Sequence, residues 1–234
     1  MQIAGLKTKT SIVLGAVVLA ASALGSASQA LEFSGASFEL MTTNSTSNTA
    51  SIVHGNVAVD MGNGLAVQLG AAFKGGDGYD QISAFEAHVS QDLGNGLTFG
   101  GFIGQETWDG DIYRYSGIEL VLTQNAFTID VSASNYRETD GTDVYRPVTL
   151  DLSYDMSDKL AIIAGYADDT SSNDDDTFSY VGVAYDIAPN VVISTTYGQD
   201  KSWSEKTIGV GVTVNFAKGV QMRQRNYTSY FPHY

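Results

Sequence analysis

Acidic residues of this 234-residue chain fall into two sets whose positions could support chemistry. One set, with a histidine beside it, lies inside segments where apolar and polar residues alternate: Glu39, Glu86, His88, Glu119, Asp130 and Asp151. The other set adjoins short turns: Asp60, Asp92, Asp155 and Asp186. Carboxylates around a common aqueous path favour cations. If the chain encloses such a path, we expect the first set to line it and the second to form a rim at one end.

The turn-proximal set has a second interpretation, because an Asp that starts a turn often accepts hydrogen bonds from nearby backbone amides. A mid-strand carboxylate facing lipid is costly, so the first set must face inward, toward water or a partner. With only 12 Lys and Arg against 26 Asp and Glu, we expect most of these carboxylates to lack a cationic partner and to need water. Small inward residues would leave room for that water: Gly70, Gly100, Gly104, Gly182, Gly209 and Gly211.

The elements that must position these residues follow from a repeat. Short turns recur every 31 or 32 residues, each between two segments of alternating polarity, at 61–64, 94–96, 124–126, 157–159 and 188–190. Alternation is the period of a β-strand, and a short Gly/Asn/Asp connection between two such segments indicates a hairpin. A repeat of this length is one hairpin plus one longer loop. The sequence predicts an all-β fold, a transmembrane up-and-down antiparallel β-barrel.

We expect about twelve strands, at 33–41, 50–60, 65–73, 81–92, 97–107, 112–123, 127–137, 147–156, 160–168, 177–187, 191–199 and 205–216. These lengths are near the ~9–11 residues that a tilted strand needs to cross a membrane. An even number of strands places both ends of the chain on the periplasmic side. The short turns are then periplasmic, and the outer loops are those at 42–49, 74–80, 139–143, 168–177 and 200–204.

The faces of the expected strands distinguish a membrane barrel from a soluble sandwich, which also alternates. In segment 147–156 aliphatic residues alternate with small or polar ones, so the two kinds lie on opposite faces. The aliphatic residues are Val148, Leu150 and Leu152, and the others are Thr149, Asp151 and Ser153. Aromatic residues such as Tyr154 and Tyr166 lie at the ends of the apolar faces. This pattern favours lipid outside, water inside and an aromatic belt at each interface.

The first thirty residues predict export. Lys7 and Lys9 precede an apolar run over 12–24, and Ser28 and Ala30 supply small residues before a cleavage point at Leu31. This is typical of a secretory signal peptide, and the run is shorter than the ~18 residues of a membrane anchor. The chain has no Cys, so we expect no disulfide, and its net charge of −14 excludes nucleic acid as a partner. We divide the chain into a signal peptide (1–30), a barrel (31–218) and a tail (219–234).

The tail and one loop leave alternatives open. The tail carries Lys218, Arg223 and Arg225 at or near its start, and Pro232 argues against a further central strand. It could fold into the acidic interior as a plug or form a disordered periplasmic end, and we prefer the second. The carboxylates around 168–176 could bind Ca²⁺ or bridge it to lipopolysaccharide. We prefer a solvated loop there.

The repeated Asp-Met/Leu-Gly-Asn-Gly-Leu turns at 60–65 and 92–97, with the final segment 207–216, resemble Gram-negative porins, most of all the alphaproteobacterial general porins. The resemblance implies an outer-membrane barrel that passes small hydrophilic solutes by diffusion. This chain is shorter than the 16-stranded members. It also lacks their arginine ladder, having only Arg114, Arg137 and Arg146 near its strands.

Hydrolysis is the alternative chemistry, since some twelve-stranded barrels are outer-membrane phospholipases. Such a site needs a His near a Ser, with a third group that orients the His. The candidates are His54, His88 and His233, but alternation turns the first two away from lipid, and no Gly-x-Ser-x-Gly segment is present. We predict no enzyme, no metal and no cofactor.

The sequence thus predicts a cation-preferring outer-membrane porin, with a closed structural or adhesive barrel as the alternative. The partners expected are outer-membrane lipids and lipopolysaccharide, small solutes or cations, and further copies of the chain in a homo-oligomer.

Overall fold

A computed structural model describes residues 32–45, 49–77, 79–108, 110–139, 144–171, 176–201 and 205–225. The expected signal peptide at 1–30 lies outside these residues, as do Asp174, Asp175, His233 and the tail beyond 225. Within the described ranges every regular element is a β-strand. No helix in them is both long and apolar enough to cross a membrane.

The strands lie close to the positions that the alternation predicts. They are β1 (Glu32–Ser45), β2 (Thr49–Gly62), β3 (Leu65–Asp77), β4 (Tyr79–Gly94), β5 (Leu97–Trp108), β6 (Asp111–Gln124), β7 (Phe127–Glu138), β8 (Val144–Tyr145), β9 (Pro147–Ser157), β10 (Leu160–Asp169), β11 (Thr177–Ala188), β12 (Val191–Asp200) and β13 (Lys206–Ala217). The two-residue β8 pairs only with the end of β7, so the other twelve strands form the wall.

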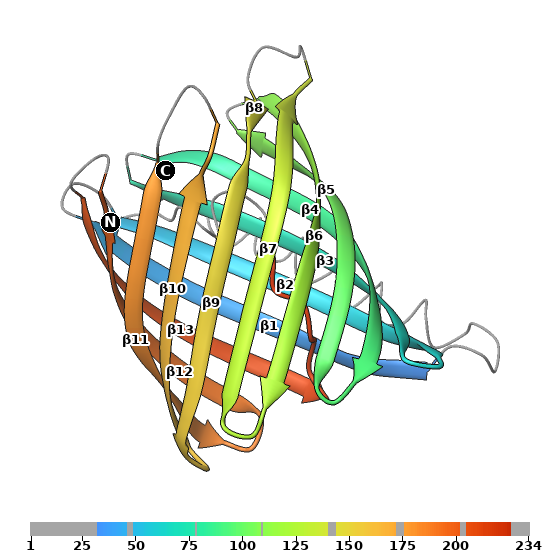
Figure 1. Ribbon diagram of the computed structural model, residues 1–234. Helices are drawn as coiled ribbons and strands as arrows, with labels where there is room; N and C mark the ends of the chain where they lie inside the picture. Colours follow the sequence, from blue (N-terminus) through green and yellow to red (C-terminus); the bar gives the residue numbers. More distant parts are fainter. Residues whose placement is uncertain are drawn as a thin grey trace.

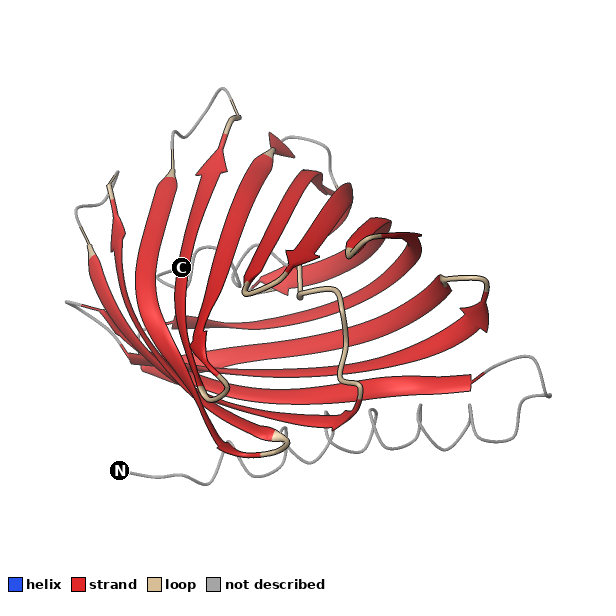
Figure 2. Ribbon diagram, turned by 60° about the horizontal axis from the view of Figure 1, so that its bottom comes forward, coloured by secondary structure: helices blue, strands red, loops and turns tan. Residues whose placement is uncertain are grey.

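The wall is one closed antiparallel sheet (Figures 1 and 2). Sequential strands pair with each other, the first strand β1 pairs with the last strand β13, and β6 pairs with β7 to complete the ring. Closure leaves no strand edge with unpaired backbone groups. The prediction of an up-and-down antiparallel barrel of twelve strands is confirmed.

The short turns form where the sequence supplies residues that tolerate a left-handed backbone. Asn63 and Gly64 have φ of 54° and 79°, and Asn95 and Gly96 have φ of 55° and 78°. A type I′ hairpin needs positive φ at both central residues, which is why Asn-Gly is its strongest sequence signal. The up-and-down topology places these turns and the other short ones at one end of the barrel.

The outward face of the wall is apolar. On β9, Val148, Leu150 and Leu152 are 36–42% exposed, whereas Thr149 between them is 2% exposed. A soluble sandwich would bury its aliphatic face against a second sheet. A barrel in a bilayer presents that face to lipid. The structure therefore excludes the sandwich and agrees with lipid outside.

Two of the expected outer loops are largely strand. β1 to β4 have 13 to 16 residues, so they take in much of 42–49 and 74–80. The antiparallel ladder continues through Ile52 paired with Lys74 and Thr49 paired with Asp77. The loop prediction was wrong there because Gly, Asp and Thr lower the local strand signal, while pairing with a neighbouring strand overrides it.

Candidate functional site inside the barrel

The acidic residues predicted for the interior do point inward. Glu86 of β4, Glu119 of β6 and Asp130 of β7 are buried, and their sequence neighbours Phe85, Leu120 and Val131 are exposed on the outer face. Asp151 of β9 and Glu39 of β1 lie on the inner face too, with side chains 13% and 29% exposed. Alternation in the strands assigned the orientation of all five correctly.

His88 joins two of these carboxylates. Its Nε2 lies 2.9 Å from Oε1 of Glu86, and its Nδ1 lies 2.7 Å from Oε1 of Glu119. A neutral imidazole donates from only one nitrogen, and a carboxylate only accepts. This geometry therefore needs a proton on both ring nitrogens or on one of the two carboxyl groups. His88 was expected to line an aqueous path, but it is a fully buried bridge between two carboxylates.

After β13 the chain turns back into the barrel. Ala217 and Gly219 have φ of 54° and 70°, and the Gly219 amide donates to the Phe216 carbonyl at 3.0 Å. A Cβ at Gly35 would overlap the backbone of Gly219, so this reversal needs the small residue on β1. Figure 1 shows the segment in red, continuing from the end of β13 into the space between the front and back strands. We call residues 219–225 the inner segment.

Arg225 of the inner segment completes the buried charge network. Its Nε lies 2.7 Å from Oε2 of Glu119, and its Nη2 lies 2.6 Å from Oδ1 of Asp130. Its backbone amide donates to Oε2 of Glu86 at 2.9 Å, and its carbonyl accepts a hydrogen bond from the Tyr136 hydroxyl. The Arg225 side chain is fully buried. Three wall strands, β4, β6 and β7, are therefore tied to one residue.

Arg223 contacts the neighbouring part of the wall, where Asp151 is the ladder partner of Asp130. Its Nη1 lies 2.5 Å from Oδ1 of Asp151 on β9 and 3.2 Å from the Tyr180 hydroxyl on β11. Asp151, and then Tyr180, raise the pKa of Arg223 well above its usual value, so this side chain stays charged. The inner segment starts after β13, and Arg225 reaches β6 and β7 on the other side of the ring, so the segment crosses the lumen.

Contacts with β3 and β5 hold the segment on either side of Arg223, at Met222 and Gln224. The Gln68 side-chain amide donates to the Met222 carbonyl at 2.8 Å, and the Met222 amide donates back to Gln68 Oε1 at 3.3 Å. A Cβ at Gly70 would lie 3.2 Å from Nε2 of Gln224, and a Cβ at Gly100 would lie 3.2 Å from Cε of Met222. These two glycines give room to the inner segment.

Three expectations are corrected by this arrangement. Glu119, Asp130 and Asp151 do have cationic partners, because the inner segment supplies them. The space beside Gly70 and Gly100 is taken by protein, and that beside Gly104 by the Tyr115 ring, where water was expected. The described part of the tail is not a disordered periplasmic end. The basic composition of 218–225 was the available signal, since an acidic interior attracts it.

An aromatic cluster lies beside the charge network on the inner wall. Its buried rings are those of Phe102, Tyr113, Tyr115, Tyr136 and Phe178. Tyr115 and Tyr136 stack with ring centroids 4.5 Å apart, and the Tyr115 hydroxyl donates to Oε2 of Glu86 at 3.0 Å. The cluster narrows the lumen further and orients Glu86.

A cavity of about 110 Å³ remains between the inner segment and the far wall. Glu39, His54 and Arg223 supply its ionisable groups, and Oε2 of Glu39 lies 3.5 Å from Nδ1 of His54. A water molecule occupies about 30 Å³ of the liquid, so the cavity has room for a few waters. It lies inside the barrel, beside β1, β2 and β10 to β13.

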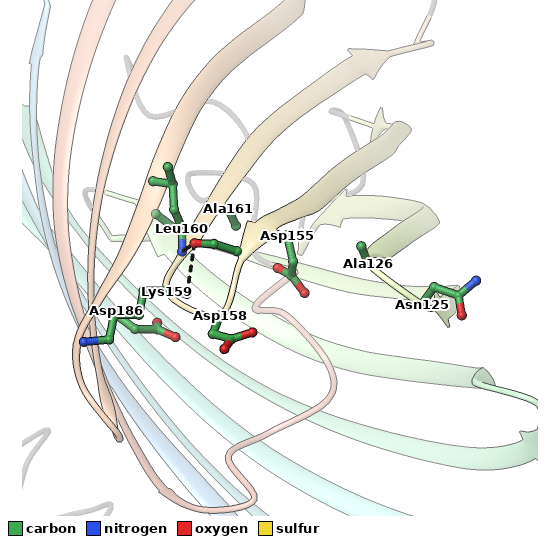
Figure 3. Close-up of a pocket in the computed structure, with 10 residues that line it drawn as sticks. Asn125, Ala126, Asp155, Asp158, Lys159, Leu160, Ala161 and Asp186 are labelled. Atoms are coloured by element: carbon green, nitrogen blue, oxygen red, sulfur yellow. Dashed lines mark hydrogen bonds between the residues drawn. The ribbon is translucent and has the colours of Figure 1, made fainter.

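The predicted rim divides into two pairs. Asp60 Oδ1 accepts from the Gly62 amide at 2.7 Å, and Asp92 Oδ1 accepts from the Gly94 amide at 2.8 Å, so this pair stabilises turns. Asp155 and Asp186 instead line a pocket of about 450 Å³ at the short-turn end, with Asp158 and Lys159 (Figure 3). The turn-stabilising interpretation therefore holds for Asp60 and Asp92, and the cation-attracting rim stays a prediction for Asp155 and Asp186.

His88 shows no hydrolytic arrangement. Both ring nitrogens of His88 contact carboxylates, so this ring cannot take a proton from a serine. In the described ranges no group of three or more His, Cys, Asp or Glu residues is placed to hold a metal ion.

No protein-family model matches the sequence, and no curated protein matches it. Solved structures do match. A KdgM porin, described as in complex with disordered oligogalacturonate, has a TM-score of 0.61 at 11% identity, over 76% of this chain and 98% of that chain. A NanC porin has a TM-score of 0.60 at 10% identity, with the same coverage of 76% and 98%.

The fold is that of a small porin barrel. At such low identity the likeness concerns the fold alone. The more specific resemblance to alphaproteobacterial porins stays a prediction.

Proposed function

We propose that the protein is an outer-membrane porin through which small hydrophilic solutes diffuse, with a preference for cations. The observation that carries this proposal is a closed barrel with an aliphatic outer face and carboxylates on its inner face. Lipid-facing aliphatics and a polar lumen are the pattern of membrane β-barrels that enclose a channel. The similarity to two porin structures supports the same class of function.

Cation preference follows from the charges that the solute would meet. Glu39 lines the residual cavity, and Asp155, Asp158 and Asp186 line a pocket at the short-turn end that contains one cation, Lys159. Carboxylate rings raise the local concentration of cations and repel anions. The KdgM structure is described with an acidic oligosaccharide, but an acidic interior would disfavour such a solute. For this chain we therefore propose cations and uncharged solutes.

The inner segment is a plug in this proposal. It crosses the lumen and joins β3, β4, β6, β7, β9 and β11 by hydrogen bonds or ion pairs. With the inner segment in place, the open space beside it is the cavity of about 110 Å³, so we expect the conductance in this state to be low. Movement of the segment would widen the path without unfolding the wall, since closure of the barrel does not involve residues after β13.

A closed structural barrel is the second candidate, and the filled half of the lumen favours it. The charge network, the aromatic cluster and the inner segment occupy the lumen beside β4 to β7. The two candidates differ in a measurable way, because only the porin passes ions.

Glu39 gives a test of selectivity that leaves the plug network intact. We expect the refolded mature protein to pass current in a planar bilayer, with a reversal potential under a KCl gradient that shows K⁺ preference. Glu39→Gln removes one carboxylate from the residual cavity and should shift the reversal potential toward zero. Glu32→Gln, at the exposed start of β1, is the control and should leave it unchanged. A folded protein that stays silent in every bilayer would support the structural barrel.

A further inference from the structure

We propose that the outer wall of the barrel carries a binding site for the phosphate group of a lipid, with phosphorylated lipid A as the ligand class. The site consists of Arg114 on β6 and Arg137 on β7, together with the polar side chains beside them. The proposal rests on the proposed outer-membrane location, because that membrane offers phosphorylated saccharolipids to an outward-facing site.

The two arginines are direct partners across the sheet. Arg114 and Arg137 face each other in the β6–β7 ladder, and both are exposed. Alternation puts them on the same face as Ile118 and Val131, which are outward. Cα atoms of partners in an antiparallel ladder lie about 4.5–5.5 Å apart. Two guanidinium groups therefore emerge side by side from the outer surface.

Like charges at such a position are destabilising unless an anion lies between them. No ion pair or hydrogen bond joins either side chain to another group in the described part of the chain. The protein as a whole carries a charge of −14, so a pair of adjacent cations is not a consequence of composition. An external anion would satisfy both residues, and Arg binds phosphate in a bidentate manner.

The surroundings of the pair fit an amphiphile rather than a free ion. A shallow hollow of about 840 Å³ is lined by Arg114 and Arg137, by the polar Gln105, Ser116 and Asn135, and by the apolar Phe85 and Ile103. The ladder orders these residues in two rows, Phe85–Gln105–Arg114–Arg137 and Ala87–Ile103–Ser116–Asn135. Polar groups could bind a sugar headgroup while Phe85 and Ile103 contact an acyl chain.

Arg114 and Arg137 also lie at the depth in the membrane where lipid headgroups are expected. Arg114 lies four residues beyond the outward Ile118, or about 13 Å along the strand. It lies near the end of the barrel opposite the two-residue turns, because β6 begins at Asp111. In the proposed orientation this end faces the outside, where the outer leaflet has its phosphates. The aliphatic band below it would contact the acyl chains.

The test is titration of the folded full-length mature barrel in detergent with bisphosphorylated lipid A, with binding followed by native mass spectrometry. We expect Arg114→Gln or Arg137→Gln to weaken binding about fivefold, and the double variant about 30-fold, from the usual attraction of one Arg to an anionic membrane surface. Lys206→Gln is the matched control, since Lys206 is an exposed outward cation at the same end of the barrel on β13. It should leave binding within twofold of the parent. Dephosphorylated lipid A should bind the parent as weakly as lipid A binds the double variant.

Several results would overturn the site. They are equal binding of phosphorylated and dephosphorylated lipid A, unchanged binding by the double variant, or displacement of lipid A by millimolar inorganic phosphate, which would indicate a site for the free ion. Sedimentation that shows a dimer in the parent and a monomer in the double variant would assign the patch to a contact between copies. Conductance separates the two proposals. A silent barrel that still selects lipid A refutes the pore alone, and a conducting barrel without that selectivity refutes the lipid site alone.

Discussion

Replacing Arg225 with Met should convert a narrow, quiet pore into one with several-fold higher and more variable conductance. Arg225 is the cation that Glu119 and Asp130 contact at 2.7 and 2.6 Å, and all three side chains are buried. Removing one partner of a buried ion pair leaves an uncompensated charge and typically costs about 3–5 kcal/mol. The two carboxylates can recover their solvation only if water enters the lumen, which requires the inner segment to move. Single-channel recording in a planar bilayer measures the result.

Lys218→Met is the matched control for this experiment. Lys218 is exposed just before the inner segment, so its loss removes one positive charge from the same part of the chain without touching the network. Deletion of 219–234 should raise conductance at least as far as Arg225→Met does. Unchanged current in both Arg225→Met and the deletion, with the barrel shown to be folded, would falsify the plug. It would mean that another part of the lumen limits the flow of ions.

The wall and the contents of the barrel differ in how far the sequence determines them. An outward residue such as Leu150 and an inward one such as Asp151 are adjacent in the chain, so the period of a strand separates them without knowledge of the fold. Asn63 and Gly64 likewise encode a type I′ turn within two residues. Strand positions, hairpin turns and the inward orientation of all five mid-strand carboxylates could therefore be predicted.

The cationic partners of those carboxylates could not be predicted from the sequence in the same way. Arg225 lies 95 residues from Asp130, 106 from Glu119 and 139 from Glu86 in the sequence, and no periodicity links them. The excess of acid suggested unpaired groups and water, because the few cations of the tail were counted apart from the barrel. Glycines at 70 and 100 pointed to space inside the wall but not to its occupant. Only the return of the chain after Gly219 shows that Gln224 and Met222 fill it.

Leu152→Arg should strongly destabilise the protein in a bilayer. The variant tests whether the outer face of the wall contacts lipid, on which the proposal of a membrane barrel depends. Leu152 lies at the middle of β9, between Ile129 of β7 and Ala164 of β10, and its side chain is 42% exposed on the outer face. An Arg at the midplane of a membrane barrel costs about 2–4 kcal/mol, and the cost falls to about 0–1 kcal/mol near the interfaces. Reversible unfolding by guanidinium in lipid vesicles measures this difference.

Met156→Arg supplies the comparison on the same strand and the same face. Met156 lies four residues closer to the short-turn end, one residue before β9 ends at Ser157, and it is exposed. If lipid surrounds the barrel, the free energy of unfolding should fall much less for Met156→Arg than for Leu152→Arg, because the longer side chain near the interface reaches water. Equal and small losses for both variants would show that water, not lipid, contacts this face. A soluble barrel would then have to hide the aliphatic surface by self-association, and the proposed porin function would fail with the membrane.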